Sequence, residues 1–256
     1  MSALVYTLAF NLTFFIQELF LVLPKALTPG LRPTLFHNNH IWEGDHPLAG
    51  LFQGAGVLAT LLSAVICALL LRRYRGSSTS VRLFLFWMVY SGLFMALPQF
   101  VIGAISPQSD VGMAMGYLGL GAPVKTSMAL AALAAIPLIA LRMTRSLLEL
   151  AEEGDPMDTA KERCLFVVRV ASLPVLLAMP MIIAFRIPRE WIEVAAVPAV
   201  VTVIGVSWIQ AGAAWRFGAV ASGRAAAVRS IAWPLASVLG LLLVFQLLLR
   251  PGVRFY

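Results

Sequence analysis

The sequence predicts an all-α fold, a polytopic bundle of about seven transmembrane helices. Hydrophobic residues make up 60% of the 256 residues and charged residues only 12%, whereas soluble domains have about 25% charged residues. Apolar runs of about 20 residues, enough to cross a bilayer core roughly 30 Å thick, recur along the chain. The runs are continuously apolar rather than alternating, so helices, and not a barrel, satisfy their backbone hydrogen bonds.

The helices follow from the apolar runs in chain order. The runs predict helices at 3–23, 48–71, 83–105, 125–143, 164–185, 191–213 and 231–249. Six or eight helices are the alternatives, because the fourth run is short and the last could be re-entrant. The first run lacks the basic start and the cleavage site of a signal peptide, so we expect a retained helix.

Prolines inside several runs predict kinks, namely Pro98, Pro137, Pro174, Pro180, Pro198 and Pro234. No polar stretch is long enough for a separate domain, so residues 1–256 are expected to form a single integral membrane domain.

The distribution of Lys and Arg predicts the orientation. Three connections hold eleven of these cations, against seven in the remaining connections and termini. The positive-inside rule then places the amino terminus and the mixed-charge loop 144–163 in the cytoplasm of what we expect to be a bacterial inner membrane. The eleven are Arg72, Arg73, Arg75, Arg82, Arg142, Arg145, Lys161, Arg163, Arg216, Arg224 and Arg229, and the seven are Lys25, Arg32, Lys125, Arg186, Arg189, Arg250 and Arg254. The histidine-rich loop 24–47 is expected outside, in the periplasm.

The net charge of +7 does not indicate nucleic acid. The cations lie in short turns beside apolar runs, where anionic lipid headgroups and topology explain them. Membrane lipids are therefore the expected surroundings. Cys67 and Cys164 form no disulfide or metal motif and are expected to pack as small apolar residues.

All three histidines, His37, His40 and His46, lie within ten residues of loop 24–47. Imidazoles near carboxylates suit zinc or another divalent transition metal, so these residues are candidate metal ligands. Neighbouring polar residues could hydrogen-bond the imidazoles and orient them, namely Asn38, Asn39, Glu43 and Asp45. The alternative is an interfacial loop in which histidine, asparagine and tryptophan lie at headgroup level.

Two carboxylates could belong to the same site. Glu18 lies within the first apolar run, where a charge is costly and usually faces protein, a cation or water. It could pair with Lys25 two turns away, or it could point into the same cavity as the histidines. Asp110 is expected on the histidine side and is a further candidate ligand, with a turn or helix cap as the alternative. Arg169, inside the fifth run, could snorkel to the interface or pair with a buried carboxylate.

Three segments, taken in order, resemble the site-2 protease family of intramembrane metalloproteases: QELFLVLPKALTPG, HPLAGLFQGAGVLATLLSAV and ALPQFVIGAISPQSDVG. The resemblance covers roughly residues 10–120. It implies that Glu18 polarises a zinc-bound water and that Asp110 is a zinc ligand. The sequence departs from the family pattern, since Gln17 and Leu21 stand in place of both zinc histidines and Val111 replaces a glycine. Zinc would then move to His37, His40 or His46, or be absent, as in a non-proteolytic relative.

These features favour an outward-facing polar, metal-binding pocket. If the protein is an enzyme, we expect metal-dependent hydrolysis of a protease-like kind, with Glu18 as the general base. One alternative is a non-catalytic integral subunit or assembly factor that packs against partner membrane subunits or another copy of itself. A second alternative is a small-solute transporter, for which proline-broken helices are the only support.

Overall fold

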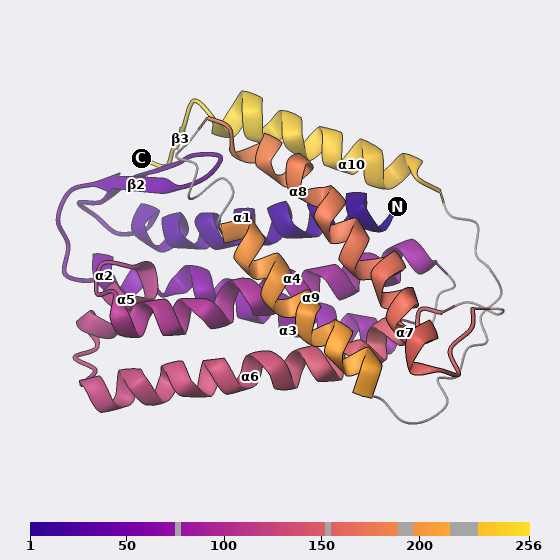
Figure 1. Ribbon diagram of the computed structural model, residues 1–256. Helices are drawn as coiled ribbons and strands as arrows, with labels where there is room; N and C mark the ends of the chain where they lie inside the picture. Colours follow the sequence, from indigo (N-terminus) through magenta and orange to yellow (C-terminus); the bar gives the residue numbers. More distant parts are fainter. Residues whose placement is uncertain (75–77, 152–154, 189–196, 216–229) are drawn as a thin grey trace.

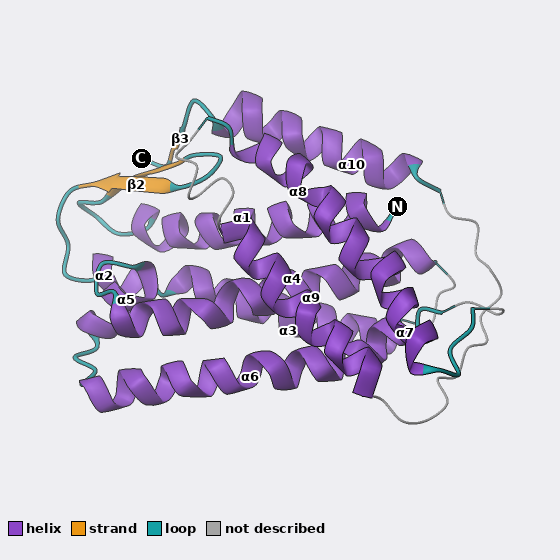
Figure 2. Ribbon diagram, in the orientation of Figure 1, coloured by secondary structure: helices purple, strands orange, loops and turns teal. Residues whose placement is uncertain are grey.

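The structure, a computed structural model, describes residues 1–74, 78–151, 155–188, 197–215 and 230–256, and not the side chains at 197, 198 and 202. Long helices dominate it (Figure 1), and Figure 2 shows strands in one small region only. Six helical segments in the described ranges are long and apolar enough to cross a membrane: Ser2–Ala26, Ala49–Arg73, Thr79–Ile105, Ala122–Leu148, Ala160–Arg186 and Ala232–Leu249. A shorter apolar helix, α9, spans Val197–Trp215. The predicted all-α membrane bundle is confirmed, and the chain is a multi-pass membrane protein.

Several of these segments are built from two or three elements. The second contains α2 (Ala49–Phe52) and α3 (Ala55–Arg73). The fifth contains α7 (Ala160–Val167), the π-helical turn η1 (Val168–Ser172) and α8 (Leu173–Arg186). The last contains α10 (Ala232–Leu243) and the π-helical turn η3 (Val244–Leu249). The other three are the single helices α1 (Ser2–Ala26), α4 (Thr79–Ile105) and α6 (Ala122–Leu148).

Helix boundaries follow local chemistry more closely than hydropathy. The fourth helix is longer than predicted, because it continues to Leu148 into the Glu-rich start of the next connection. The fifth begins at Ala160, where Thr159 and Glu162 form a reciprocal capping box that satisfies the first free N–H groups. Residues 191–196 of the sixth predicted helix, with Arg75, Arg189, Arg216, Arg224 and Arg229, lie outside the described residues, as does the side chain of Pro198.

Helix α1 lies in the core, where it packs against α3, α4, α8 and α10. Its buried aromatic residues meet those of α4, and the rings of Tyr6 and Trp87 are 4.7 Å apart between centroids. Helices α3 and α4 pack closely at Gly92, where an added Cβ would lie 2.8 Å from the Ala64 side chain. Leucines on α3, α6 and α10 instead point outward, as expected for lipid-facing surfaces.

The two ends of the bundle differ. The amino terminus, the end of α3, the start of α4 and the start of α7 lie at one end (Figure 1). The opposite end carries the carboxyl terminus and a small antiparallel sheet, ordered β2-β1-β3, from β1 (Arg32–Leu35), β2 (His40–Glu43) and β3 (Val253–Arg254). It also carries the short helices α2 and α5 (Asp110–Tyr117). The predicted histidine-rich loop therefore contains a β-hairpin.

The hairpin has a defined register, in which Leu35 pairs with His40 and Arg32 with Glu43. Just beyond this pairing, Gly44 has a φ of +93°, and an added Cβ there would collide with the carbonyl of Gly30. Glycine is therefore required at position 44, since a side chain would push the two ends of the hairpin apart. Strand β1 also packs against α1, which holds the hairpin over the end of the bundle.

Candidate functional site

The hairpin brings His40 to Glu18 of α1. The Nδ1 atom of His40 lies 2.9 Å from Oε2 of Glu18, and only 7% and 9% of the two side chains is exposed. Since an ionised carboxylate only accepts hydrogen bonds, the Nδ1–H group donates to Glu18. The sequence expectation that Glu18 points toward the histidines is thus met for His40.

The other side of the same imidazole meets a lysine. The ammonium Nζ of Lys25 lies 3.2 Å from Nε2 of His40. Lys25 also donates to the carbonyl of Leu21 at 2.8 Å and to Oε1 of Gln53 at 3.0 Å, and it lies 4.5 Å from the ring centroid of Trp42. Because an ammonium group only donates, His40 accepts from Lys25 at Nε2, and this nitrogen also lies 3.1 Å from Oε1 of Gln53. His40 therefore bridges the acid and the cation that could have paired directly.

This Glu18–His40–Lys25 chain balances charge inside the protein. Lys25 is fully buried, and a buried cation is tolerated only when it is paired and hydrogen-bonded. Neither ring nitrogen of His40 is left for a metal ion, because Glu18 contacts one and Lys25 the other.

Asp110 lies beside this chain, as the first residue of α5. Ser109, and not Asp110, caps that helix, because its hydroxyl accepts from the N–H of Gly112 at 3.2 Å. Burial raises the pKa of the Asp110 carboxyl above its ordinary value, and the negative charge of Glu18 raises it further. The positive charge of Lys25 and the imidazole of His40 act in the opposite direction. The two carboxylates thus share one electrostatic environment, although they come from elements far apart in sequence.

Glu18, His40 and Asp110 all line a cavity of 820 Å³ at the hairpin end. Its apolar lining residues are Phe14, Phe94, Met95, Pro98, Ile102, Val111, Met113, Val200 and Val201. Its other polar lining residues are Gln17, Asn38, Asn39, Trp42, Gln53, Gln99, Gln108, Ser109 and Arg186. The lining comes from α1, the hairpin, the start of the second segment, α4, α5, α8 and α9, so it exists only in the folded bundle. We call it the large pocket.

The other predicted ligands do not join His40. His37 is buried, and His46 is half-buried. The Nδ1 atom of His46 accepts a hydrogen bond from the N–H of Leu48. Neither histidine lines the large pocket. Among the described residues, no group of three or more His, Cys, Asp or Glu side chains could hold a metal ion. The expectation of a zinc centre, with a hydrolase built on it, finds no support in this geometry.

The residues expected to orient the imidazoles have other positions. Asn38 donates to the backbone carbonyl of Arg186 at 3.2 Å, and Asn39 lines the large pocket. Glu43 and Asp45 are exposed. Arg169, at the other end of the bundle, is exposed and pairs with Asp155, which fits an arginine that reaches toward the interface.

Sequence reasoning missed several polar residues of this site, among them Gln17, Gln53, Gln99 and Arg186. Gln17 and Gln99 face each other across α1 and α4, with Nε2 of Gln99 donating to Oε1 of Gln17 at 3.0 Å. Gln53 accepts a hydrogen bond from Lys25. The guanidinium carbon of Arg186 lies 4.1 Å from the ring centroid of Phe14. For the glutamines, a side-chain amide within or beside an apolar run was a usable sequence signal. Burying an amide without a hydrogen-bond partner is costly, so such a residue is expected to face another polar group.

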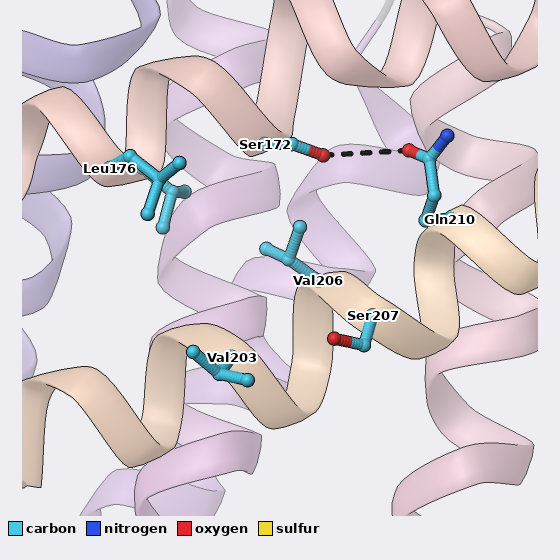
Figure 3. A pocket seen from close by; sticks show the side chains of 7 residues that line it. Ser172, Leu176, Val203, Val206, Ser207 and Gln210 are labelled. Carbon is cyan, nitrogen blue, oxygen red and sulfur yellow. Dashed lines mark hydrogen bonds between the residues drawn. The ribbon is translucent and has the colours of Figure 1, made fainter.

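A second, smaller pocket lies between η1–α8 and α9 (Figure 3). Its volume is 240 Å³, and Ser172 and Gln210 face each other across it, with the hydroxyl of Ser172 3.4 Å from Oε1 of Gln210. Gln210 also donates to the carbonyl of Cys164 at 3.1 Å. Its lining contains no titratable side chain, so the large pocket is the better candidate for function.

No model of a known protein family matches this chain, and comparisons with curated proteins and with solved structures found no significant similarity. The class of protein therefore follows from the fold: a multi-pass membrane protein with a pocket near one end of the bundle that is lined by both polar and apolar residues. The resemblance to site-2 proteases stays a prediction from three sequence segments.

Proposed function

We propose that this protein binds a small amphiphilic molecule in the large pocket. The observation that carries the proposal is the pocket's composition: apolar side chains from α1, α4, α5 and α9 line it together with amides and charged groups from α1, α4, α5, α8 and the hairpin. Its 820 Å³ volume lies within the range of about 300–1,000 Å³ found for small-molecule sites. Such a pocket can hold an apolar tail and hydrogen-bond a polar head.

The charged groups support a binding role over a purely structural one. Ionisable residues inside membrane helices are costly, and they usually mark a ligand, ion or proton site. Glu18 uses one oxygen on His40, and within the described part of the chain its other oxygen has no hydrogen-bond partner. This oxygen is available to a bound polar group.

Access from the lipid supports an amphiphile over a water-soluble ligand. Ile102, near the end of α4, lines the large pocket, and 47% of its surface is exposed. A molecule dissolved in the membrane could therefore enter beside α4 without crossing the water phase. We place this end of the bundle on the outer side of a bacterial inner membrane, because the connections that the sequence assigns to the opposite side hold eleven Lys and Arg residues against seven.

A test compares two isoleucines of the same helix. Ile102→Trp adds bulk to the wall of the large pocket, whereas Ile105→Trp adds the same bulk at a site that is 79% exposed and does not line it. Both proteins are purified from membranes, and their bound small molecules are extracted and quantified by mass spectrometry. We expect the wild type and Ile105→Trp to carry the same amphiphile, and Ile102→Trp to carry several-fold less. Equal amounts in all three proteins would contradict the proposal.

A further inference from the structure

The large pocket is rich in side-chain amides. Six of them line it: Gln17, Asn38, Asn39, Gln53, Gln99 and Gln108. An amide carries an acceptor oxygen and two N–H donors, so it can bind a neutral polar group without contributing charge. The way in which these amides are already used indicates what they can still bind.

The first pair joins α1 to α4. Gln99 uses its NH₂ group twice, toward Oε1 of Gln17 at 3.0 Å and toward the carbonyl of Met95 at 3.0 Å. Within the described residues, the oxygen of Gln99 and the NH₂ group of Gln17 then make no hydrogen bond. One acceptor and one donor remain side by side on the pocket wall.

The second set lies at the hairpin. Gln53 accepts from Lys25 with its oxygen, at 3.0 Å, and Asn38 donates with its NH₂ group to the carbonyl of Arg186, at 3.2 Å. In the part of the chain that the structure covers, the NH₂ group of Gln53 and the oxygen of Asn38 have no further partner. This second set again presents one donor and one acceptor.

The charges around the pocket disfavour a charged head group. Charges of both signs lie together here, so an anionic head attracted to Arg186 also meets the carboxylates of Glu18 and Asp110, and a cationic head attracted to those carboxylates also meets Arg186 and, behind His40, the ammonium of Lys25. Like charges repel strongly where water is excluded. A neutral head group avoids both costs.

We propose that the amphiphile has an uncharged head group with several hydroxyls, such as a sugar or another polyol, on an apolar tail. Each hydroxyl donates one hydrogen bond and accepts others, which matches adjacent unused donors and acceptors on the amides. This inference rests on the proposed amphiphile-binding function. It adds that the head group is selected by hydrogen bonds and not by charge.

The test compares four compounds that share an eight-carbon tail. Octyl glucoside, octanol, octylamine and octyl phosphate are each titrated, below their micelle concentrations, against the full chain in lipid nanodiscs, with empty nanodiscs as background. We expect saturable binding of octyl glucoside at least tenfold tighter than that of the other three. A few net hydrogen bonds of about 1 kcal/mol each suffice, since 1.4 kcal/mol corresponds to a factor of ten.

Variants of the glutamines distinguish binding of the head group from binding of the tail. Gln99→Leu is expected to weaken octyl glucoside about tenfold and to leave octanol unchanged, whereas Gln210→Leu, outside the large pocket, should change neither. If Gln99→Leu does not fold, Gln108→Leu replaces it, because Gln108 is an exposed residue that also lines the pocket; the octyl glucoside affinity should then fall several-fold, again without a change for octanol.

The failures are distinguishable. Octylamine or octyl phosphate binding as tightly as octyl glucoside overturns the head-group inference and leaves amphiphile binding intact. Equal losses for octyl glucoside and octanol in the glutamine variants overturn it as well. Absence of saturable binding for all four compounds overturns the amphiphile-binding function itself, and the inference with it.

Discussion

Replacing His40 should detach the hairpin from the bundle. His40→Leu keeps a side chain of similar bulk but removes the bridge between Glu18 and Lys25, leaving a buried carboxylate and a fully buried ammonium without their shared partner. A hydrogen bond to a charged group contributes about 1.5–3 kcal/mol, and His40 makes two of them. Lys25 keeps its bonds to Leu21 and Gln53, so we expect a loss near the lower bound for two such bonds, about 3 kcal/mol.

The matched control is His46→Leu. The His46 ring is half-buried and accepts one hydrogen bond, from the N–H of Leu48, so its loss should cost about 1 kcal/mol or less. Hydrogen–deuterium exchange of the amides in 32–43 measures hairpin opening directly. A loss of about 3 kcal/mol corresponds to roughly a hundredfold faster exchange. Equal exchange in His40→Leu and His46→Leu would refute the reasoning, because the hairpin would then not depend on the bridge.

Three further predictions concern charge, orientation and metal. The raised pKa of Asp110 means that the folded state holds this proton more tightly than the unfolded state. The free energy of unfolding should therefore fall as pH rises from the ordinary pKa range of an aspartate through the raised pKa of Asp110. Asp110→Asn should flatten this fall when unfolding is measured between pH 4 and 8. An unchanged dependence of the unfolding free energy on pH in this variant would contradict the pKa shift. In a Cys67→Ala, Cys164→Ala background in intact cells, a membrane-impermeant maleimide should label Asp45→Cys at once and Arg72→Cys only after permeabilisation, and the reverse order would invert our topology. Chelation with EDTA should leave thermal unfolding unchanged, since both nitrogens of the central histidine are engaged by side chains, and a lowered melting temperature would reveal a structural metal.

The bundle was predictable because an apolar run of about 20 residues has the length and the hydrophobicity that crossing a bilayer requires. Runs around Glu18, Gly92 and Pro137 are long and predominantly apolar, and only a helix satisfies their backbone in lipid. The hairpin was not predictable in the same way. Its strands are four residues long, and they are stabilised by antiparallel pairing and by packing against α1, which no local pattern reports.

The site was predictable only in part. A carboxylate in an apolar run and a histidine-rich segment indicated that Glu18 and a histidine could meet, and the structure places His40 there. Which histidine meets it depends on the hairpin register, because strand residues alternate between faces. The amides were missed because their importance depends on Gln17 and Gln99 facing each other across two helices, a contact between residues 82 positions apart.

A high-resolution structure of the protein purified from membranes tests the central claim most directly. We predict an elongated non-protein density in the large pocket, with its tail beside Ile102 and its polar end against Gln17, Gln99 and Glu18. A pocket that contains ordered water alone, or one closed by its own side chains, would contradict the account and leave the buried charges with a structural role.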